Sequence, residues 1–156
     1  MVAEQFLSRR RQSDFYLQVG VMATQPFDWA QYHKVAGELS THAEEAYLRT
    51  SISRAYYYIF HLGRKRVLDN GFILNRGDAH KQVWEKFSDS PDHRCRKLAE
   101  DAKRLKEKRE RADYESHYPR IDIDAPIVVT LAAQFATGLA ILDVALPRNT
   151  GVMRKN

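Results

Sequence analysis

Apolar residues recur at intervals of three and four along most of this chain, a spacing that is typical of α-helices rather than strands. The first clear run predicts a helix near residues 28–40, with Asp28 as its N-terminal cap. Residues 1–27 show no equally clear pattern, and their structure stays open: a short helix over 4–17 and an extended segment over 19–22 both fit the sequence.

Four further helices are predicted after this one. Each begins near a residue that commonly caps helices, and most end where a glycine or proline interrupts the pattern. Their expected extents are 40–70, 78–87, 91–118 and 124–146, with Asp78 as the cap of the second and Pro91 or Asp92 opening the third. Gly71 supplies the stop after the first of these. Pro119 should end the third, because the residue before a proline disfavours helical geometry, and residues 121–123 then bridge to a last helix capped by Asp124.

These elements predict an all-α fold, an antiparallel bundle of four main helices and one short helix. A chain of 156 residues that is 44% apolar and 29% charged fits one globular domain, which we expect to span residues 28–146. The remaining residues, 147–156, are expected to form a flexible basic tail. Cys95 is the only cysteine, so no internal disulfide is possible, and we expect a cytoplasmic protein.

The segment 125–142 contains no charged residue and approaches the length that crosses a bilayer. It is rich in alanine and carries Thr130, Gln134 and Thr137, a weaker composition than that of leucine-rich membrane spans. We therefore expect a helix that is buried in the core or shared between subunits, and no membrane association.

Positive charge is concentrated before the end of the fourth predicted helix. The chain has a net charge of +5, and between Arg94 and Arg111 it has nine Lys or Arg against four Asp or Glu. Two interpretations stay open: a surface for a polyanion such as RNA, or a solvated helix with ion pairs between residues four apart, such as Glu100 with Arg104.

The residues after this basic run suit phosphodiester chemistry. Arg109, Asp113 and His117 are spaced by four, so on a continuous helix they share one face. Histidine exchanges a proton near neutral pH, and a guanidinium stabilises the charge that develops on a phosphate during attack by a ribose 2′-hydroxyl. Arg111 lies about 120° from His117 on an ideal helix, so these two meet only if the last turn unwinds or a second subunit contributes.

Other chemistries lack their sequence patterns. The chain has no HExxH and no paired CxxC, and His93 with Cys95 is too little for a metal site. A glycine-rich phosphate loop and a Gly-x-Ser-x-Gly turn are also missing, which excludes P-loop NTPases and typical α/β-hydrolases. We expect no metal and no cofactor.

Three segments together resemble the HEPN superfamily: Ser53–His61 (SRAYYYIFH), Gly77–His80 (GDAH) and Arg109–Tyr114 (RERADY). The match covers roughly residues 28–145. It implies a small helical bundle, usually dimeric and frequently a metal-independent endoribonuclease of toxin–antitoxin or defence systems. The catalytic signature of the family is an arginine followed, after four to six residues, by a histidine.

Two placements of that signature compete. Arg111 has five residues between it and His117, whereas Arg109 begins the "RxxADY" form, a branch in which the histidine is often missing. With Arg109 as the functional arginine, Tyr114 stands where a closely spaced histidine would fall, and catalysis is in doubt. A twofold axis could bring both copies of the motif into one cleft.

The resemblance therefore implies an endoribonuclease that acts as a homodimer on RNA, with a nucleotidyltransferase-type antitoxin as a possible partner. Its alternative is a non-catalytic HEPN-like module that binds such a partner or RNA. The residues expected to serve the site are, for catalysis, Arg109, Arg111 and His117; for support, Asp113, Tyr114 and Tyr118; and for RNA binding, Arg54, Arg104 and Lys108. By ordinary packing statistics, Arg54 and the tyrosines beside it belong to the bundle, with one salt bridge, and His80 stabilises a helix start.

Overall fold

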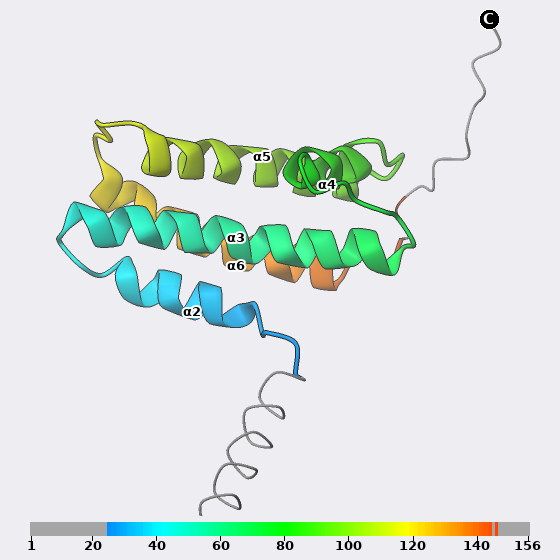
Figure 1. Ribbon diagram of the computed structural model, residues 1–156, viewed down its shortest axis with the longest axis horizontal. Helices are drawn as coiled ribbons and strands as arrows, with labels where there is room; N and C mark the ends of the chain where they lie inside the picture. Colours follow the sequence, from blue (N-terminus) through cyan, green and yellow to red (C-terminus); the bar gives the residue numbers. More distant parts are fainter. Residues whose placement is uncertain (1–24, 145, 147–156) are drawn as a thin grey trace, which may run out of the picture.

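A computed structural model describes residues 25–144 and residue 146, and this part of the chain contains five helices and no strand. The helices are α2 (Ala30–Leu39), α3 (Glu45–Asp69), α4 (Ala79–Ser88), α5 (His93–Tyr114) and α6 (Ile121–Ala140), shown in Figure 1. The all-α prediction is confirmed. Three helices are long, whereas α2 is as short as α4, at 10 residues each. The predictions for residues 1–24 and for the basic tail lie outside the described residues.

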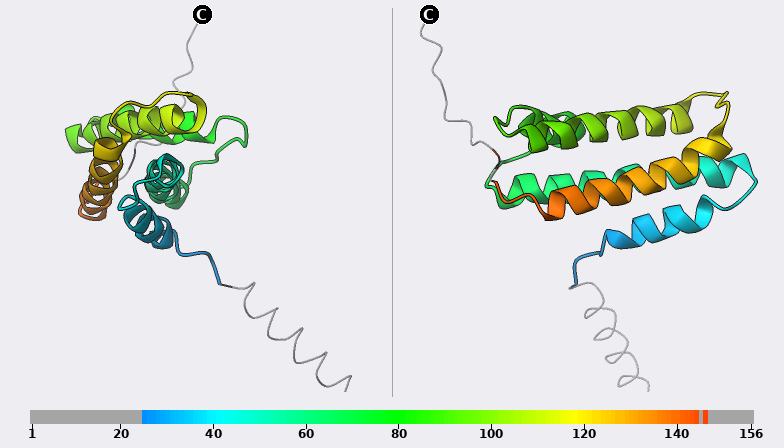
Figure 2. Two further views of the ribbon diagram at one scale, coloured as in Figure 1. Left: turned by 90° about the vertical axis from the view of Figure 1, so that its left-hand side faces the viewer. Right: turned by 180° about the vertical axis from the view of Figure 1, so that it is seen from behind.

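Helix α3 is the centre of the molecule, because it contacts each of the other four helices. The end-on view in Figure 2 shows α3 with α2, α5 and α6 around it, and α4 packs on α5 and α3. Its buried face includes Ile52, Ala55, Tyr56 and Ile59, none of which has measurable solvent exposure. A tyrosine in the middle of this core is unusual enough to need a hydrogen-bond partner.

Helix ends follow the predicted caps in part. The Asp28 and Asp92 carboxylates accept hydrogen bonds from the backbone N–H groups of Ala30 (3.0 Å) and Arg94 (2.8 Å). Gly71 follows α3 with a φ of 83°, the left-handed conformation that glycine adopts without steric cost. Asp78, in contrast, makes no side-chain capping bond to α4.

Four predicted boundaries are wrong. Helix α3 begins at Glu45 rather than near residue 40, α6 ends early, and the other two lie at the connection between α5 and α6. Helix α5 ends at Tyr114, because Glu115 has extended backbone geometry (ψ 134°). Helix α6 begins at Ile121, directly after Arg120 in the left-handed conformation (φ 62°), and residues 121–123 therefore belong to it instead of bridging to it. Asp124 lies in the first turn of α6, where its carboxylate accepts hydrogen bonds from Lys108 and Tyr118 rather than capping the helix. The C-terminal end also differs, at Ala140 rather than 146.

Only one face of α6 is buried. Val128, Ala132 and Phe135 pack in the core, whereas Ile127 and Leu131 are exposed. By length and composition alone α6 could cross a membrane, which is weak support for a span because core helices pass the same test. The expectation of a core helix is therefore met by one side of α6, and the other side is an uncovered apolar surface.

Candidate functional site

Arg109 is a charged residue in the core. It continues the apolar face of α5 after Leu105, and only 8% of its surface is exposed. Its Nη2 donates a hydrogen bond to the Tyr57 hydroxyl on α3 at 3.1 Å, and its Nε lies 3.5 Å from the Asp113 carboxylate one helical turn later. Arg109 and Asp113 therefore come together as the four-residue spacing predicts.

Aromatic rings complete the surroundings of this guanidinium. Its Cζ lies 5.2 Å and 5.5 Å from the ring centroids of Tyr57 and Tyr56, and 5.9 Å from that of Tyr114. Rings attract a cation through their negative faces, which offsets part of the cost of its burial. The Nε of Arg109 is buried and has no hydrogen-bond partner among the described residues. One N–H donor of the guanidinium is therefore unused, and its surroundings are mostly apolar.

A second polar chain, formed by Trp84, Tyr56 and His80, adjoins Arg109. Trp84 Nε1 donates to the Tyr56 hydroxyl at 3.2 Å, and that hydroxyl lies 2.8 Å from His80 Nδ1. An indole N–H is only a donor, so the Tyr56 hydroxyl accepts from Trp84, and its own proton is available for a hydrogen bond to Nδ1 of His80. Burial, followed by the charges of Arg109 and Lys106, lowers the pKa of His80, in agreement with a neutral ring. Burial raises the pKa of Tyr56 to about 12, so its proton is firmly held.

A band of half-buried rings and cations runs along α3 beside this core. The Arg54 guanidinium lies 5.1 Å from the Tyr57 ring centroid and 4.8 Å from that of Tyr32, so two arginines share Tyr57. One turn further, His61 stacks on Trp29 with 3.3 Å between the ring centroids. Arg54 forms no ion pair among the described residues, contrary to the salt bridge that ordinary packing would give it. This band offers both flat rings and guanidinium groups.

Arg111 and His117 do not join the Arg109 cluster. Arg111 lies two residues after Arg109, about 200° around α5, and its Nε pairs with Glu115 at 3.1 Å. His117 follows the end of α5 and is exposed, and within the described residues it makes no hydrogen bond or ion pair. The predicted shared face of Arg109, Asp113 and His117 is therefore wrong at its last member, because the helix stops three residues too early.

The loop that carries His117 is nevertheless firmly attached. Arg49 of α3 donates two hydrogen bonds of 2.7 Å to the backbone carbonyls of Ala112 and Glu115, which caps the C-terminus of α5. At the other end of the loop, Tyr118 donates to Asp124 at 2.9 Å. Burial and that bond raise the pKa of Tyr118. Burial acts to raise the pKa of Asp124, but hydrogen bonds from Lys108 and Tyr118 outweigh it and lower the pKa.

The basic run is mostly paired internally. Seven of its nine cations lie within 4.0 Å of a carboxylate: Arg94, Lys97, Arg104, Lys106, Lys108, Arg109 and Arg111. Arg104 is nearest to Asp101, at 3.9 Å, and does not form the expected pair with Glu100. Exposed pairs of this kind are weak, so a polyanion can still compete for the cations, and both interpretations of the run stay open.

Sequence reasoning missed Arg49, and it assigned Tyr56 to bundle packing and His80 to a helix start without linking either residue to this site. The sequence does not reveal the role of an arginine early in an amphipathic helix or of a tyrosine at a core position. Such roles can be inferred only when the neighbouring helices are known. Among the described residues no group of three or more His, Cys, Asp or Glu could hold a metal ion. Comparison of the chain with known protein families, with characterised proteins and with solved structures gives no match.

Proposed function

We propose that this protein is a HEPN-like, metal-independent endoribonuclease of the toxin–antitoxin or defence type, and that it acts as a homodimer. The observation that carries the proposal is the Arg109 guanidinium, buried at the end of α5 and held by Tyr57 and Asp113. A fixed cation in surroundings of low polarity stabilises a developing phosphate charge far better than a mobile surface cation does.

In this proposal the 2′-hydroxyl of one ribose attacks the adjacent phosphorus, the bond to the 5′-oxygen breaks, and that oxygen leaves with a proton. The products are a 2′,3′-cyclic phosphate and a 5′-hydroxyl. His117 accepts the first proton or donates the second, and Arg109 or Arg111 binds the phosphate oxygens. A twofold pairing of protomers through the ends of α5 would supply the missing imidazole, and the exposed Tyr114, 78% accessible beside Arg109, would be covered by it.

The test is cleavage of labelled RNA by the purified chain in EDTA, compared with His117→Ala, Arg109→Gln and Arg111→Gln. We expect wild-type cleavage to leave cyclic phosphate ends, and His117→Ala to lower the rate at least about a hundredfold. The more damaging of the two arginine variants identifies the functional arginine. His93→Ala is the matched control, because His93 is an exposed histidine at the opposite end of α5. Intact RNA at high protein concentration, or equal rates for wild type and His117→Ala, would refute the mechanism.

A second candidate, a non-catalytic HEPN-like module, is favoured by one specific observation. His117 makes no polar contact among the described residues, and Arg111 is paired with Glu115 and lines a hollow with Glu107 and Glu110, an acidic setting for a phosphate. This candidate would bind RNA, or a nucleotidyltransferase partner, through the band of half-buried rings and cations along α3. It predicts RNA binding that weakens steeply with salt and with Arg54→Gln, without strand cleavage.

A further inference from the structure

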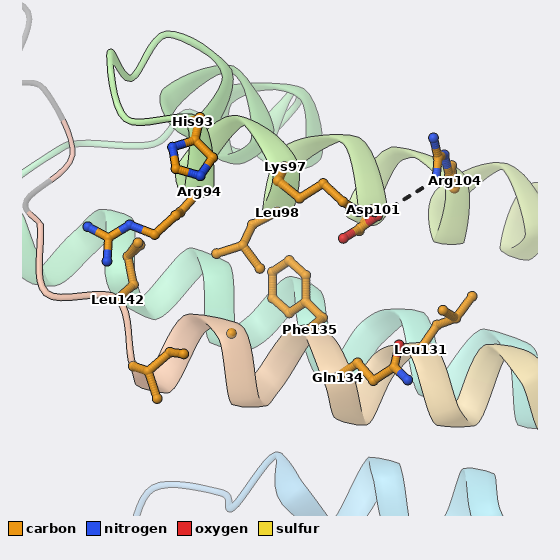
Figure 3. A pocket seen from close by; sticks show the side chains of 12 residues that line it. His93, Arg94, Lys97, Leu98, Asp101, Arg104, Leu131, Gln134, Phe135 and Leu142 are labelled. Atoms are coloured by element: carbon orange, nitrogen blue, oxygen red, sulfur yellow. Dashed lines mark hydrogen bonds and ion pairs between the residues drawn. The ribbon is translucent and has the colours of Figure 1, made fainter.

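Helices α5 and α6 enclose an elongated hollow that the Arg109 cluster does not reach. It consists of two depressions, of about 310 Å³ and 360 Å³, which share Arg104 and Leu131 in their linings. The floor of the 310 Å³ depression is apolar: Leu98 of α5 and Phe135 of α6 face one another there, as Figure 3 shows. We call this feature the α5/α6 seam.

The two walls of the seam differ in chemistry. The α6 wall carries no charge, because no charged residue occurs from Ala125 to Leu142. It presents Leu131 and Ile141, of which Ile141 is 75% exposed. Large aliphatic side chains left open along a hollow mark a surface that another apolar group covers.

The α5 wall is basic at its rim. Lys97, Arg104 and Lys108 line the seam, and their side chains are 59%, 72% and 41% exposed. The carboxylates nearest to them lie deeper, with Asp101 32% and Asp124 20% exposed. Asp101 must also serve both Lys97 and Arg104. The only other acid among the described residues that line the two depressions is Glu107, against five Lys or Arg once Arg94 and Arg111 are counted, so positive charge is left over at the rim.

We infer that the seam binds an amphipathic helix of a partner protein, one with an apolar stripe bordered on one side by Asp or Glu. The shape supports a helix, because the two depressions follow one another along α5 and share Arg104 and Leu131. Exposed aliphatic residues also occur along α6 from Ile123 to its C-terminal cap Ile141, about 27 Å at 1.5 Å per residue. The walls set its orientation: apolar side chains at positions i, i+4 and i+7 enter the seam against α6, and the acidic edge faces α5.

Other occupants fit the charges less well. Residues 1–24 carry three Arg against Glu4 and Asp14, and residues 147–156 carry cations and no acid, so neither terminal segment of the chain supplies an acidic edge. A second copy seated in the seam would bring α5, with its own excess of Lys and Arg, toward the basic rim. The inference does not rest on the proposed nuclease: Arg109 and His117 line neither depression, and of the residues proposed to act on the phosphate only Arg111 lines the 360 Å³ depression.

The test is selection from a displayed library of 18-residue helical peptides on the immobilised full chain, followed by affinity measurement with the purified peptides. We expect enrichment of peptides with an apolar stripe and an acidic edge, and loss of at least about tenfold in affinity with Leu131→Glu. Arg104→Glu should weaken the acidic peptides and favour counterparts in which lysine replaces the acids. A charge swap of this kind separates direct contact from a general loss of structure.

Two controls keep the outcomes distinct. Arg54→Gln, on the aromatic band, should bind the peptides as wild type does. Far-UV circular dichroism establishes that Leu131→Glu, a change at an exposed position, remains folded. The inference is overturned by the absence of peptides that distinguish wild type from Leu131→Glu, by enrichment of basic peptides, or by a wild-type dimer that Leu131→Glu converts to a monomer, since a second copy then covers the seam.

Discussion

Arg109 on α5 and Tyr57 on α3 are joined by a hydrogen bond of 3.1 Å from Nη2 to the phenolic oxygen, and the Arg54 guanidinium lies 5.1 Å from the same ring. Tyr57 therefore accepts a hydrogen bond from one cation at its hydroxyl and contacts a second cation with its ring. A buried cation with a single good hydrogen-bond acceptor depends strongly on that acceptor. The pair Arg109 and Tyr57 is thus both a structural link between two long helices and the support of the proposed phosphate site.

Replacing Tyr57 by Phe should lower the free energy of unfolding by about 1–3 kcal/mol, because a buried guanidinium loses its acceptor while the ring stays in place. Urea unfolding followed by circular dichroism measures the change. Tyr58→Phe is the matched control: the Tyr58 hydroxyl makes no hydrogen bond among the described residues, so the loss should stay below about 0.5 kcal/mol. Equal losses in both variants would mean that the Arg109 bond contributes nothing specific.

A contact between α3 and α4 leads to a second prediction, at Gly63. A Cβ placed there would lie 2.7 Å from two ring carbons of Trp84, and a buried indole held by its own hydrogen bond to Tyr56 has little freedom to move. Gly63→Ala should therefore destabilise the protein by about 1–3 kcal/mol.

Gly37 in α2 provides the opposite case for the same measurement. A Cβ there meets nothing within 4 Å, so Gly37→Ala should stabilise the protein by about 0.5–1 kcal/mol through the helix propensity of alanine. Thermal unfolding of Gly63→Ala and Gly37→Ala, measured side by side, tests both predictions. A stabilised Gly63→Ala would show that Trp84 is not fixed as the structure has it.

Features that depend on neighbouring residues in the chain can be predicted from this sequence, whereas features that depend on contacts between distant residues cannot. The apolar period and the caps at Asp28, Asp92 and Gly71 are local, and they locate all five helices, although α3 begins five residues later and α6 ends six residues earlier than predicted. The end of α5 is not local, because Arg49, more than sixty residues earlier, binds its last carbonyls. The pairing of Arg109 with Asp113 follows from spacing, whereas its pairing with Tyr57 requires knowledge of which helices are neighbours.

Two half-buried histidines, His61 and His80, predict a pH dependence. Burial, followed by the charges of Arg64 and His80, lowers the pKa of His61 to about 4 from an ordinary value of about 6.5. Between these values the unfolded chain binds more protons at this position than the folded protein does, so stability falls as the pH decreases through this window and is retained above it. The pKa of His80 is lowered in the same direction.

Urea midpoints measured at about pH 7.5, 6 and 5 test this expectation. The wild type should lose stability over that series, and His61→Gln should flatten the loss. His93→Gln should leave the series unchanged, because His93 is exposed at the start of α5. A wild-type midpoint that is constant or rises toward pH 5 would contradict the lowered pKa values.

Arg49 supports the last prediction, which concerns the loop that carries His117. Its guanidinium donates to the carbonyls of Ala112 and Glu115 at 2.7 Å each, so Arg49→Met would leave the end of α5 without its cap while keeping most of the side-chain volume. We expect a loss of about 1–3 kcal/mol in the free energy of unfolding and faster amide hydrogen exchange in residues 112–118.

Lys65→Met is the control for Arg49→Met, since Lys65 is also on α3 but pairs only with the exposed Asp69. Its exchange rates should match those of the wild type. If the chain cleaves RNA through His117, Arg49→Met should also lower the rate without removing any group that contacts substrate. Unchanged exchange in Arg49→Met would instead mean that Tyr118 and Asp124 alone hold the loop, because their hydrogen bond of 2.9 Å is the other attachment of this segment to the bundle.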